Sequence, residues 1–311
     1  MSITQLLTQD QVSFFKTFGF LVRKNVFTPD EVRAYSEEIG RRAADSARCV
    51  PFEPEKIGQG GRQHSMLGAS TPFTTSLVED ERMVGAAEQM CGEIAWAESS
   101  GIQFVGDSVW HYDGGCFEAS GVNNLIYTQP VRADSGALRI IPGSHLPAFH
   151  EMVASFDPLG PQWTRAAATP EQKQRALDDI GAIPCFVCDA DPGDVVSFHL
   201  RVYHGSLGGG TDRRACTLAY HAQPQTPEQT ELAILVSQHA LKTRDNSSDP
   251  WNPSKGFPDE WQANPQNNPR RAFWIEQLHK FSQMETEQHG VRATAENGKW
   301  KMVPFDSVRK D

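Results

Sequence analysis

The sequence is poor in basic residues, with 29 lysines and arginines against 39 aspartates and glutamates, which gives a formal net charge of −10 at pH 7. Non-specific nucleic-acid binding needs a dense cationic face, so we expect no nucleic-acid partner. The sequence also lacks an apolar run of about 18 residues, the length that a helix needs to cross a bilayer. We therefore expect no membrane partner.

Cysteine is also scarce, because only six are scattered over 311 residues. This number is too low for the framework of a disulfide-stapled secreted domain. Cys185 and Cys188 have the C-x-x-C spacing but no second pair to complete a zinc site, which favours buried strand cysteines over metal or redox chemistry. Residues 1–15 have neither the cationic start nor the long apolar core of a secretory signal. Together these absences predict a cytoplasmic protein.

The composition that is present, 39% hydrophobic and 22% charged, is that of a globular protein with ample material for a core. From about residue 100 to 223, short apolar runs recur between turn signals, which is typical of an all-β core. The runs span residues 102–105, 122–127, 137–141, 183–187, 194–198 and 215–220. The sequence therefore predicts a mainly β protein.

Helices are expected on both sides of this β core. Thr8 and Gln11 fit a capping box before a helix that Gly19 ends, and residues 20–26 predict a short strand. Residues 47–75 are rich in Gly, Pro, Ser and Gln and predict a loop. Further helices are predicted to begin at residue 28 and to cover residues 77–97, 228–242 and 269–286, with a helical insertion near 160–180.

The sharpest local feature is Trp110-His111-Tyr112-Asp113, directly after a predicted strand. Residues i and i+2 of an extended chain face the same side, so His111 and Asp113 can present an imidazole and a carboxylate to one point. His204 follows another predicted strand and is the candidate third ligand. Two histidines and one carboxylate on one face of a metal leave the opposite face open, which suits non-haem Fe(II). On spacing alone, ordinary strand-end histidines are the alternative.

Two adjacent arginines, Arg213 and Arg214, head the predicted strand 215–220. A guanidinium inside a barrel would bind the far carboxylate of a dicarboxylic co-substrate through a two-pronged hydrogen bond. Side chains alternate along a strand, so only one of the two can point inward. The residues alone leave both open, and solvated arginines at a strand start are the alternative.

Five blocks of the sequence occur in an informative order. They are Leu7–Val22, Trp110–Asp113, Asp134–His145, Gly193–Ser206 and Arg213–Ala215. In this order the blocks resemble the phytanoyl-CoA dioxygenase-like family of Fe(II)- and 2-oxoglutarate-dependent oxygenases, over about residues 5–223. The resemblance implies a double-stranded β-helix, which is the jelly-roll or cupin-like fold of two packed sheets, with flanking helices.

The resemblance also implies roles for individual residues. His111, Asp113 and His204 correspond to iron ligands, and Arg213 corresponds to the family's co-substrate arginine, with its neighbour Arg214 as the alternative. Gln103, on the strand before the first motif, is the nearest match to a polar residue that helps to bind 2-oxoglutarate. Related halogenases replace the carboxylate ligand with a small residue, so an aspartate at this position favours hydroxylation or another oxidation over halogenation.

The activity that the resemblance implies is hydroxylation of a C–H bond, with Fe(II) as cofactor, 2-oxoglutarate and O2 as co-substrates, and succinate and CO2 as co-products. We expect a small-molecule substrate, a polar metabolite or natural-product intermediate, with Arg62 and Arg139 as candidates to contact an anionic group on it. Three alternatives stay open. They are desaturation, cyclisation or epimerisation with the same cofactors, a jelly roll that binds a ligand or metal without turnover, and a zinc hydrolase with the same ligands.

The same sequence patterns predict the domain organisation. We expect one catalytic domain over residues 1–311, with N-terminal helices and a loop in 1–99 and the jelly-roll core in 100–223. Residues 224–311 form a C-terminal extension that we expect to be a lid or a subunit contact, and a subunit contact would imply a homo-oligomer.

Overall fold

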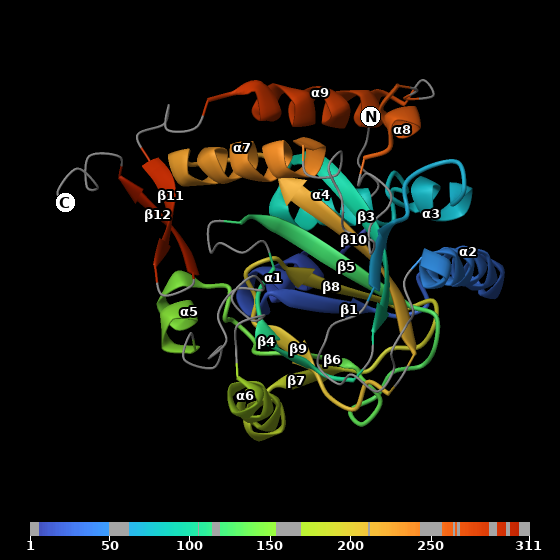
Figure 1. The fold of residues 1–311 in the computed structure, drawn as a ribbon, viewed down its shortest axis with the longest axis vertical. Coiled ribbons are helices and arrows are strands. Elements are labelled where there is room, and N and C mark those ends of the chain that lie inside the picture. Colours follow the sequence, from blue (N-terminus) through green and yellow to red (C-terminus); the bar gives the residue numbers. More distant parts are fainter. Residues whose placement is uncertain are drawn as a thin grey trace.

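Two antiparallel sheets lie at the centre of the molecule (Figure 1). The larger has six strands in the order β1 (Phe20–Arg23), β8 (Val195–His199), β5 (Gly121–Tyr127), β10 (Arg213–Ala222), β3 (Ile94–Phe104) and β2 (Arg62–Ser65). The smaller has four in the order β4 (Ser108–His111), β9 (His204–Ser206), β6 (Leu138–Ile140) and β7 (Phe186–Cys188). Between β3 and β10 the chain crosses repeatedly from one sheet to the other, as in a jelly roll. The predicted fold class is confirmed.

The structure is a computed structural model, and it describes most of the chain. The described residues are 6–49, 62–104, 106–113, 119–153, 169–210, 212–242, 257–263, 265, 268–285, 291–296 and 299–304. Outside the two main sheets, β11 (Val291–Glu296) pairs with β12 (Lys299–Pro304) in a hairpin that the sequence did not predict.

The space between the two sheets is apolar at one end and accessible at the other. Leu125, Val196, Phe198, Leu138 and Ile140 are among the buried residues that fill the apolar end. Alternate side chains of β10 face this space, because side chains along a strand point in turn to opposite faces. Those nearest the start of β10 are buried, whereas those further along are half-buried, namely Thr217, Ala219 and His221. The inner face of β10 is therefore more exposed toward the end of the strand than at its start.

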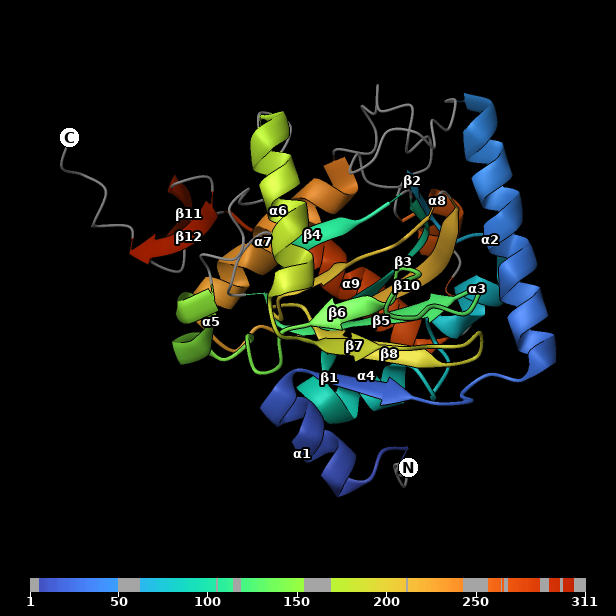
Figure 2. The same ribbon diagram turned by 90° about the horizontal axis from the view of Figure 1, so that it is seen from below.

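Helices cover the outer face of the larger sheet. The apolar residues of α1 (Gln9–Phe18), α2 (Pro29–Cys49), α3 (Pro72–Leu77), α4 (Val84–Cys91), α7 (Pro227–Lys242), α8 (Asp259–Ala263) and α9 (Pro269–Gln283) form one buried cluster with that face. Figure 2 shows α6 (Pro170–Ala182) over β4 of the smaller sheet, with the short α5 (Pro147–Val153) beside it. Of the helices in the described ranges, none has the length and apolar character needed to cross a bilayer.

Several local predictions are confirmed. Thr8 and Gln11 form the predicted capping box, in which each side chain accepts a hydrogen bond from the other's backbone N–H. Gly19 ends α1 with a φ of 81°, a left-handed conformation that favours glycine. The predicted helices at 228–242 and 269–286 correspond to α7 and α9.

Two local predictions are wrong. The helix predicted over 77–97 stops at Cys91, Gly92 follows with a φ of 88°, and β3 already begins at Ile94. The alanine-rich run of residues 94–97 suits a helix by propensity, but pairing with β10 across the whole length of β3 outweighs it. The loop predicted over 47–75 also contains β2, which joins the edge of the larger sheet, and the start of α3.

Candidate metal centre

His111 and His204 lie side by side on two neighbouring strands of the smaller sheet. They are register partners in the antiparallel pair β4–β9, and their ring centroids are 4.1 Å apart. Ser108 pairs with Ser206 in the same ladder, so three steps on β4 match two steps on β9. This extra residue is a β-bulge, which lets Ser108 and His111 both face the interior although strict alternation would put them on opposite faces.

The residue before the first histidine anchors β4 from outside. Trp110 is 1% exposed, and its indole Nε1 donates to the backbone oxygen of Asp179 on α6 at 3.4 Å. Trp110 faces the helix, so the next residue, His111, is turned into the space between the sheets.

Each imidazole is oriented by its own strand. Nδ1 of His111 lies 2.8 Å from the carbonyl oxygen of Val109, and Nδ1 of His204 lies 3.0 Å from that of Val202. A carbonyl only accepts hydrogen bonds, so Nδ1 carries the proton and Nε2 keeps a lone pair. This is the tautomer that a metal-binding histidine needs, with its second nitrogen held by the backbone.

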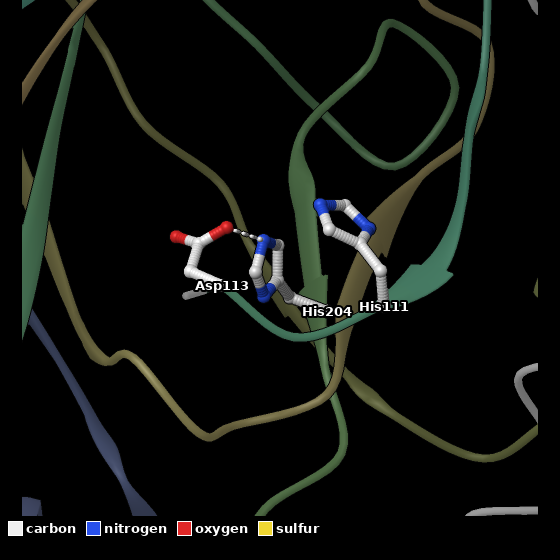
Figure 3. A group of neighbouring side chains, drawn as sticks. All are labelled: His111, Asp113 and His204. Atoms are coloured by element: carbon white, nitrogen blue, oxygen red, sulfur yellow. Dashed lines mark ion pairs between the residues drawn. The ribbon is translucent and has the colours of Figure 1, made fainter. Parts of the chain in front are cut away.

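Asp113 completes the cluster from the turn that follows β4 (Figure 3). Its Oδ1 lies 3.6 Å from Nε2 of His204, and its Oδ2 accepts a hydrogen bond from Nδ2 of Asn123 at 2.9 Å. The ligand atoms of the three side chains all lie within 4.8 Å of one another. The structure thus brings the three predicted ligands together from two strands about 90 residues apart in sequence.

The donor set fits a divalent iron ion. Ligand atoms on one ion at about 2.1 Å lie roughly 3 Å apart, so small side-chain movements would close the cluster around a metal. Two neutral imidazoles and one carboxylate on one side are the ligands that non-haem Fe(II) prefers when further positions must stay open. Within the described ranges, no fourth histidine, cysteine or carboxylate joins this group.

Arg213 lies inside the barrel at the start of β10. It is 5% exposed, its guanidinium donates to the carbonyl oxygen of Gly136 at 2.6 Å and to Oγ of Ser206 at 3.0 Å, and it lies over the Phe104 ring. Burial lowers the pKa of Arg213 below its usual value, against the opposing effect of Tyr127. The described residues give this buried cation hydrogen-bond acceptors that are all neutral, so it has the capacity to bind a carboxylate.

Arg214 and Gln103 lie on the other face of the larger sheet. They are register partners on β10 and β3, and both bind the carboxylate of Asp212. Arg214 does so with two hydrogen bonds of 2.9 Å. The structure therefore separates these two residues from the interior that holds Arg213.

No contact among the described residues links either candidate substrate arginine to the cluster of His111, Asp113 and His204. Arg139 pairs with Gly205 on β9 while its neighbour Ile140 pairs with His204, so Arg139 lies on the outer face of the smaller sheet. Its guanidinium donates to the carbonyl oxygen of Ala133 at 2.8 Å. Arg62 has its backbone on β2, and its side chain lies outside the described part of the chain.

Sequence reasoning missed two polar positions on the inner face of the larger sheet. Asn123 binds the carboxylate of Asp113, and His221, read from the sequence as a surface or core histidine, faces the interior near Glu98. The available signal was a polar residue inside an apolar run, as in Gly121–Tyr127. To separate inner from outer positions, one would need to know which alternate residues of each strand face the interior.

Comparison with known proteins points to one group of enzymes. The chain is 28% identical over 155 residues to the ectoine dioxygenase of Bordetella bronchiseptica and 29% identical over 141 residues to that of Streptomyces anulatus. These matches cover 45% and 41% of this chain, and 50% and 48% of the relatives. The chain thus spans about half the length of these curated relatives.

Solved structures share the fold. HygX from Streptomyces hygroscopicus, crystallised with nickel and 2-oxoglutarate, is 21% identical with a TM-score of 0.50, over 70% of this chain and 88% of that one. EctD from S. alaskensis with bound Fe is 21% identical with a TM-score of 0.50, over 70% and 77% of the two chains. At these identities the likeness concerns the fold alone.

The match to a family profile is more extensive. The profile described as "Phytanoyl-CoA dioxygenase (PhyH)" covers residues 15–216, which is 202 of the 311 residues and includes His111, Asp113 and His204. The resemblance in the five sequence blocks and the jelly-roll fold agree with it. The chain therefore belongs to the phytanoyl-CoA dioxygenase (PhyH) family.

Proposed function

We propose that this protein is an Fe(II)- and 2-oxoglutarate-dependent dioxygenase that hydroxylates a C–H bond of a small molecule, with succinate and CO2 as co-products. The observation that carries the proposal is the convergence of His111, Asp113 and His204 near Arg213, a buried cation with no salt-bridge partner among the described residues. Membership of the PhyH family and the similarity to ectoine dioxygenases support it.

The spacing of the cluster and the arginine suits a five-carbon dicarboxylate. Ser206, which accepts a hydrogen bond from Arg213, is two residues along β9 from His204. Two residues of a strand span about 7 Å. Asp113 and the two histidines would hold the iron ion. 2-Oxoglutarate would place one carboxylate on the Arg213 guanidinium and its keto-acid end at the ion.

The chain's own groups would position and shield the reaction. Bound iron supplies the activation of dioxygen and the oxidation of the substrate. The two backbone carbonyls fix the imidazoles, Asn123 fixes the carboxylate of Asp113, and the buried apolar residues between the sheets exclude water from the side of Arg213. The half-buried inner positions of β10 leave room for a substrate on the other side.

The test is anaerobic binding of Fe(II) and then of 2-oxoglutarate by calorimetry, followed by succinate detection across a library of small metabolites with oxygen present. We expect one iron per chain, 2-oxoglutarate binding that depends on iron, and succinate release with at least one metabolite. Iron binding without 2-oxoglutarate binding would contradict the proposal and favour a binding protein. Turnover without oxygen or 2-oxoglutarate would favour the zinc hydrolase, and the product structure separates hydroxylation from desaturation, cyclisation and epimerisation.

Replacing Asn123 by alanine is expected to weaken Fe(II) binding about tenfold, since groups that orient a metal ligand typically contribute 10–100-fold to metal affinity. The variant frees Oδ2 of Asp113 and lets the carboxylate rotate. Calorimetric titration of Fe(II) under nitrogen measures the effect.

The adjacent amide provides the matched control. Asn124 is fully buried and faces away from the cluster, bonded to Ser197 and to the backbone of Leu218. Asn124→Ala is expected to lower the melting temperature and leave iron affinity unchanged. Equal iron affinity in the Asn123→Ala and wild-type proteins would show that Asn123 does not position the ligand.

A further inference from the structure

The carboxylate of Glu98 and the imidazole of His221 lie on the inner face of the larger sheet, on the side of the candidate metal centre. Glu98 on β3 lies opposite Ala219 on β10, and Ala219 lies opposite Asn123 on β5, so these three residues form one row across the inner face of the larger sheet. His221 is two residues further along β10, and its Nε2 lies 3.6 Å from Oε1 of Glu98. The middle residue of the row is alanine, so no polar side chain of β10 stands between Glu98 and the amide that binds Asp113.

The charge of Glu98 has no cationic counterpart in this row. Within the described part of the chain its one ion-pair partner is His221, and the Glu98 side chain is 25% exposed. Burial lowers the pKa of His221 below its usual value, while the carboxylates of Glu98 and Asp113 act in the opposite direction. Burial thus disfavours a positive charge on the imidazole, so the Glu98 carboxylate has no strong cationic partner among the described residues.

A second acceptor lies in the same row. Nδ2 of Asn123 donates to Asp113, which fixes the direction of the amide because a carboxylate only accepts. The remaining oxygen, Oδ1, is buried and has no hydrogen-bond partner among the described residues. A buried acceptor without a donor is costly, so a ligand that brings N–H donors between Glu98 and Asn123 would satisfy both groups.

His221 also lines a cleft under the C-terminal extension. The walls of this cleft, which is open to solvent, include His221, Trp96, Ser120 and, from α7, Gln229 and Leu232. The Trp96 indole stacks on the His221 ring with centroids 4.9 Å apart and planes 20° apart, which holds the imidazole toward Glu98. Figure 1 shows α7 across this end of β10.

We propose that Glu98 is the specificity-determining residue of the reaction and that the substrate is a small molecule with a basic nitrogen, an ammonium or guanidinium group, which binds the Glu98 carboxylate and Oδ1 of Asn123. The inference rests on the proposed function, because it takes the candidate metal centre as the place of reaction. It differs from the expectation that Arg62 and Arg139 meet an anionic substrate group.

The test compares two probes of equal length, 1,4-diaminobutane and 1,4-butanediol, with agmatine as a guanidinium probe. Each is titrated by calorimetry into protein loaded anaerobically with Fe(II) and 2-oxoglutarate, at about 0.15 M salt to screen attraction to the acidic surface. We expect both cationic probes to bind the wild-type protein about tenfold or more tightly than the diol, as a charge-assisted hydrogen bond provides. Glu98→Gln should remove this preference and keep the binding of iron and 2-oxoglutarate.

The matched control is Glu93→Gln, which removes an equal charge from an exposed position just before β3 and should keep the preference. If Glu98→Gln fails to fold, Glu98→Asp withdraws the carboxylate by one methylene and should weaken diamine binding without affecting the diol. The inference is overturned if the diol binds as tightly as the diamine, if no probe binds, or if the preference survives in Glu98→Gln. Failure of the wild-type protein to bind iron and 2-oxoglutarate would instead refute the proposed function, and this inference with it.

Discussion

Replacing His204 by alanine is expected to abolish stoichiometric Fe(II) binding and to reduce succinate formation at least about a thousandfold. A catalytic metal supplies several kcal/mol of stabilisation to a reaction, and each 1.4 kcal/mol is about tenfold in rate. His204 is 4% exposed and its Nε2 faces Asp113, so the change removes one of the three clustered ligand atoms. Iron content after anaerobic reconstitution and gel filtration, together with succinate release, measures the effect.

The fold should survive this change. The variant loses one hydrogen bond, from Nδ1 to the carbonyl of Val202, and some buried volume, which together cost about 1–3 kcal/mol of unfolding free energy. His279→Ala, at an exposed histidine on α9, controls for adventitious iron binding by imidazole. A His204→Ala protein that still holds one iron per chain and makes succinate would refute the ligand assignment.

Replacing Arg213 by glutamine is expected to raise the dissociation constant for 2-oxoglutarate about a hundredfold. Losing one member of a buried hydrogen-bonded charge pair costs roughly 2–5 kcal/mol, and about 3 kcal/mol corresponds to two powers of ten. The Fe(II) affinity should change little, because Arg213 contacts Gly136 and Ser206 and none of the three clustered side chains. Calorimetric titration of 2-oxoglutarate into the iron-loaded protein measures the constant.

The neighbouring residue is the natural control for this variant. Arg214→Gln removes the same charge one position along β10, but its guanidinium pairs with Asp212 on the outer face of the sheet. It should bind 2-oxoglutarate like the wild-type protein. If Arg214→Gln lost 2-oxoglutarate and Arg213→Gln kept it, the two arginines would have to exchange roles.

The sequence was sufficient to single out the three candidate metal ligands, because each of them stands in a short motif. His111 and Asp113 stand in one short motif and His204 in another, and each motif follows an apolar run that predicts a strand. The sequence could not show the bulge in β4, because the extra residue between Ser108 and His111 is defined only by the register with β9. Their convergence therefore depends on a pairing between strands that no local pattern reveals.

The residues around the ligands were harder to assign, because a strand's phase is not visible in its composition. Gln103 and Arg214 were candidates for the co-substrate site, yet alternation puts both on the outer face with Asp212. Glu98 and Asn123, which lie on the inner face, were not among the candidates. Whether β3 presents its odd or even residues to the interior is decided by pairing with β10, which is a long-range contact.

The bonds that orient the two imidazoles are local to their own strands. In both cases the acceptor is the carbonyl two residues earlier, Val109 for His111 and Val202 for His204. The backbone of each strand thus fixes the orientation of its own imidazole ring, through a hydrogen bond that involves neither α7 nor the cleft. Substitutions in α7 or in the walls of the cleft that suit a different molecule would therefore leave the orientation of the two rings unchanged.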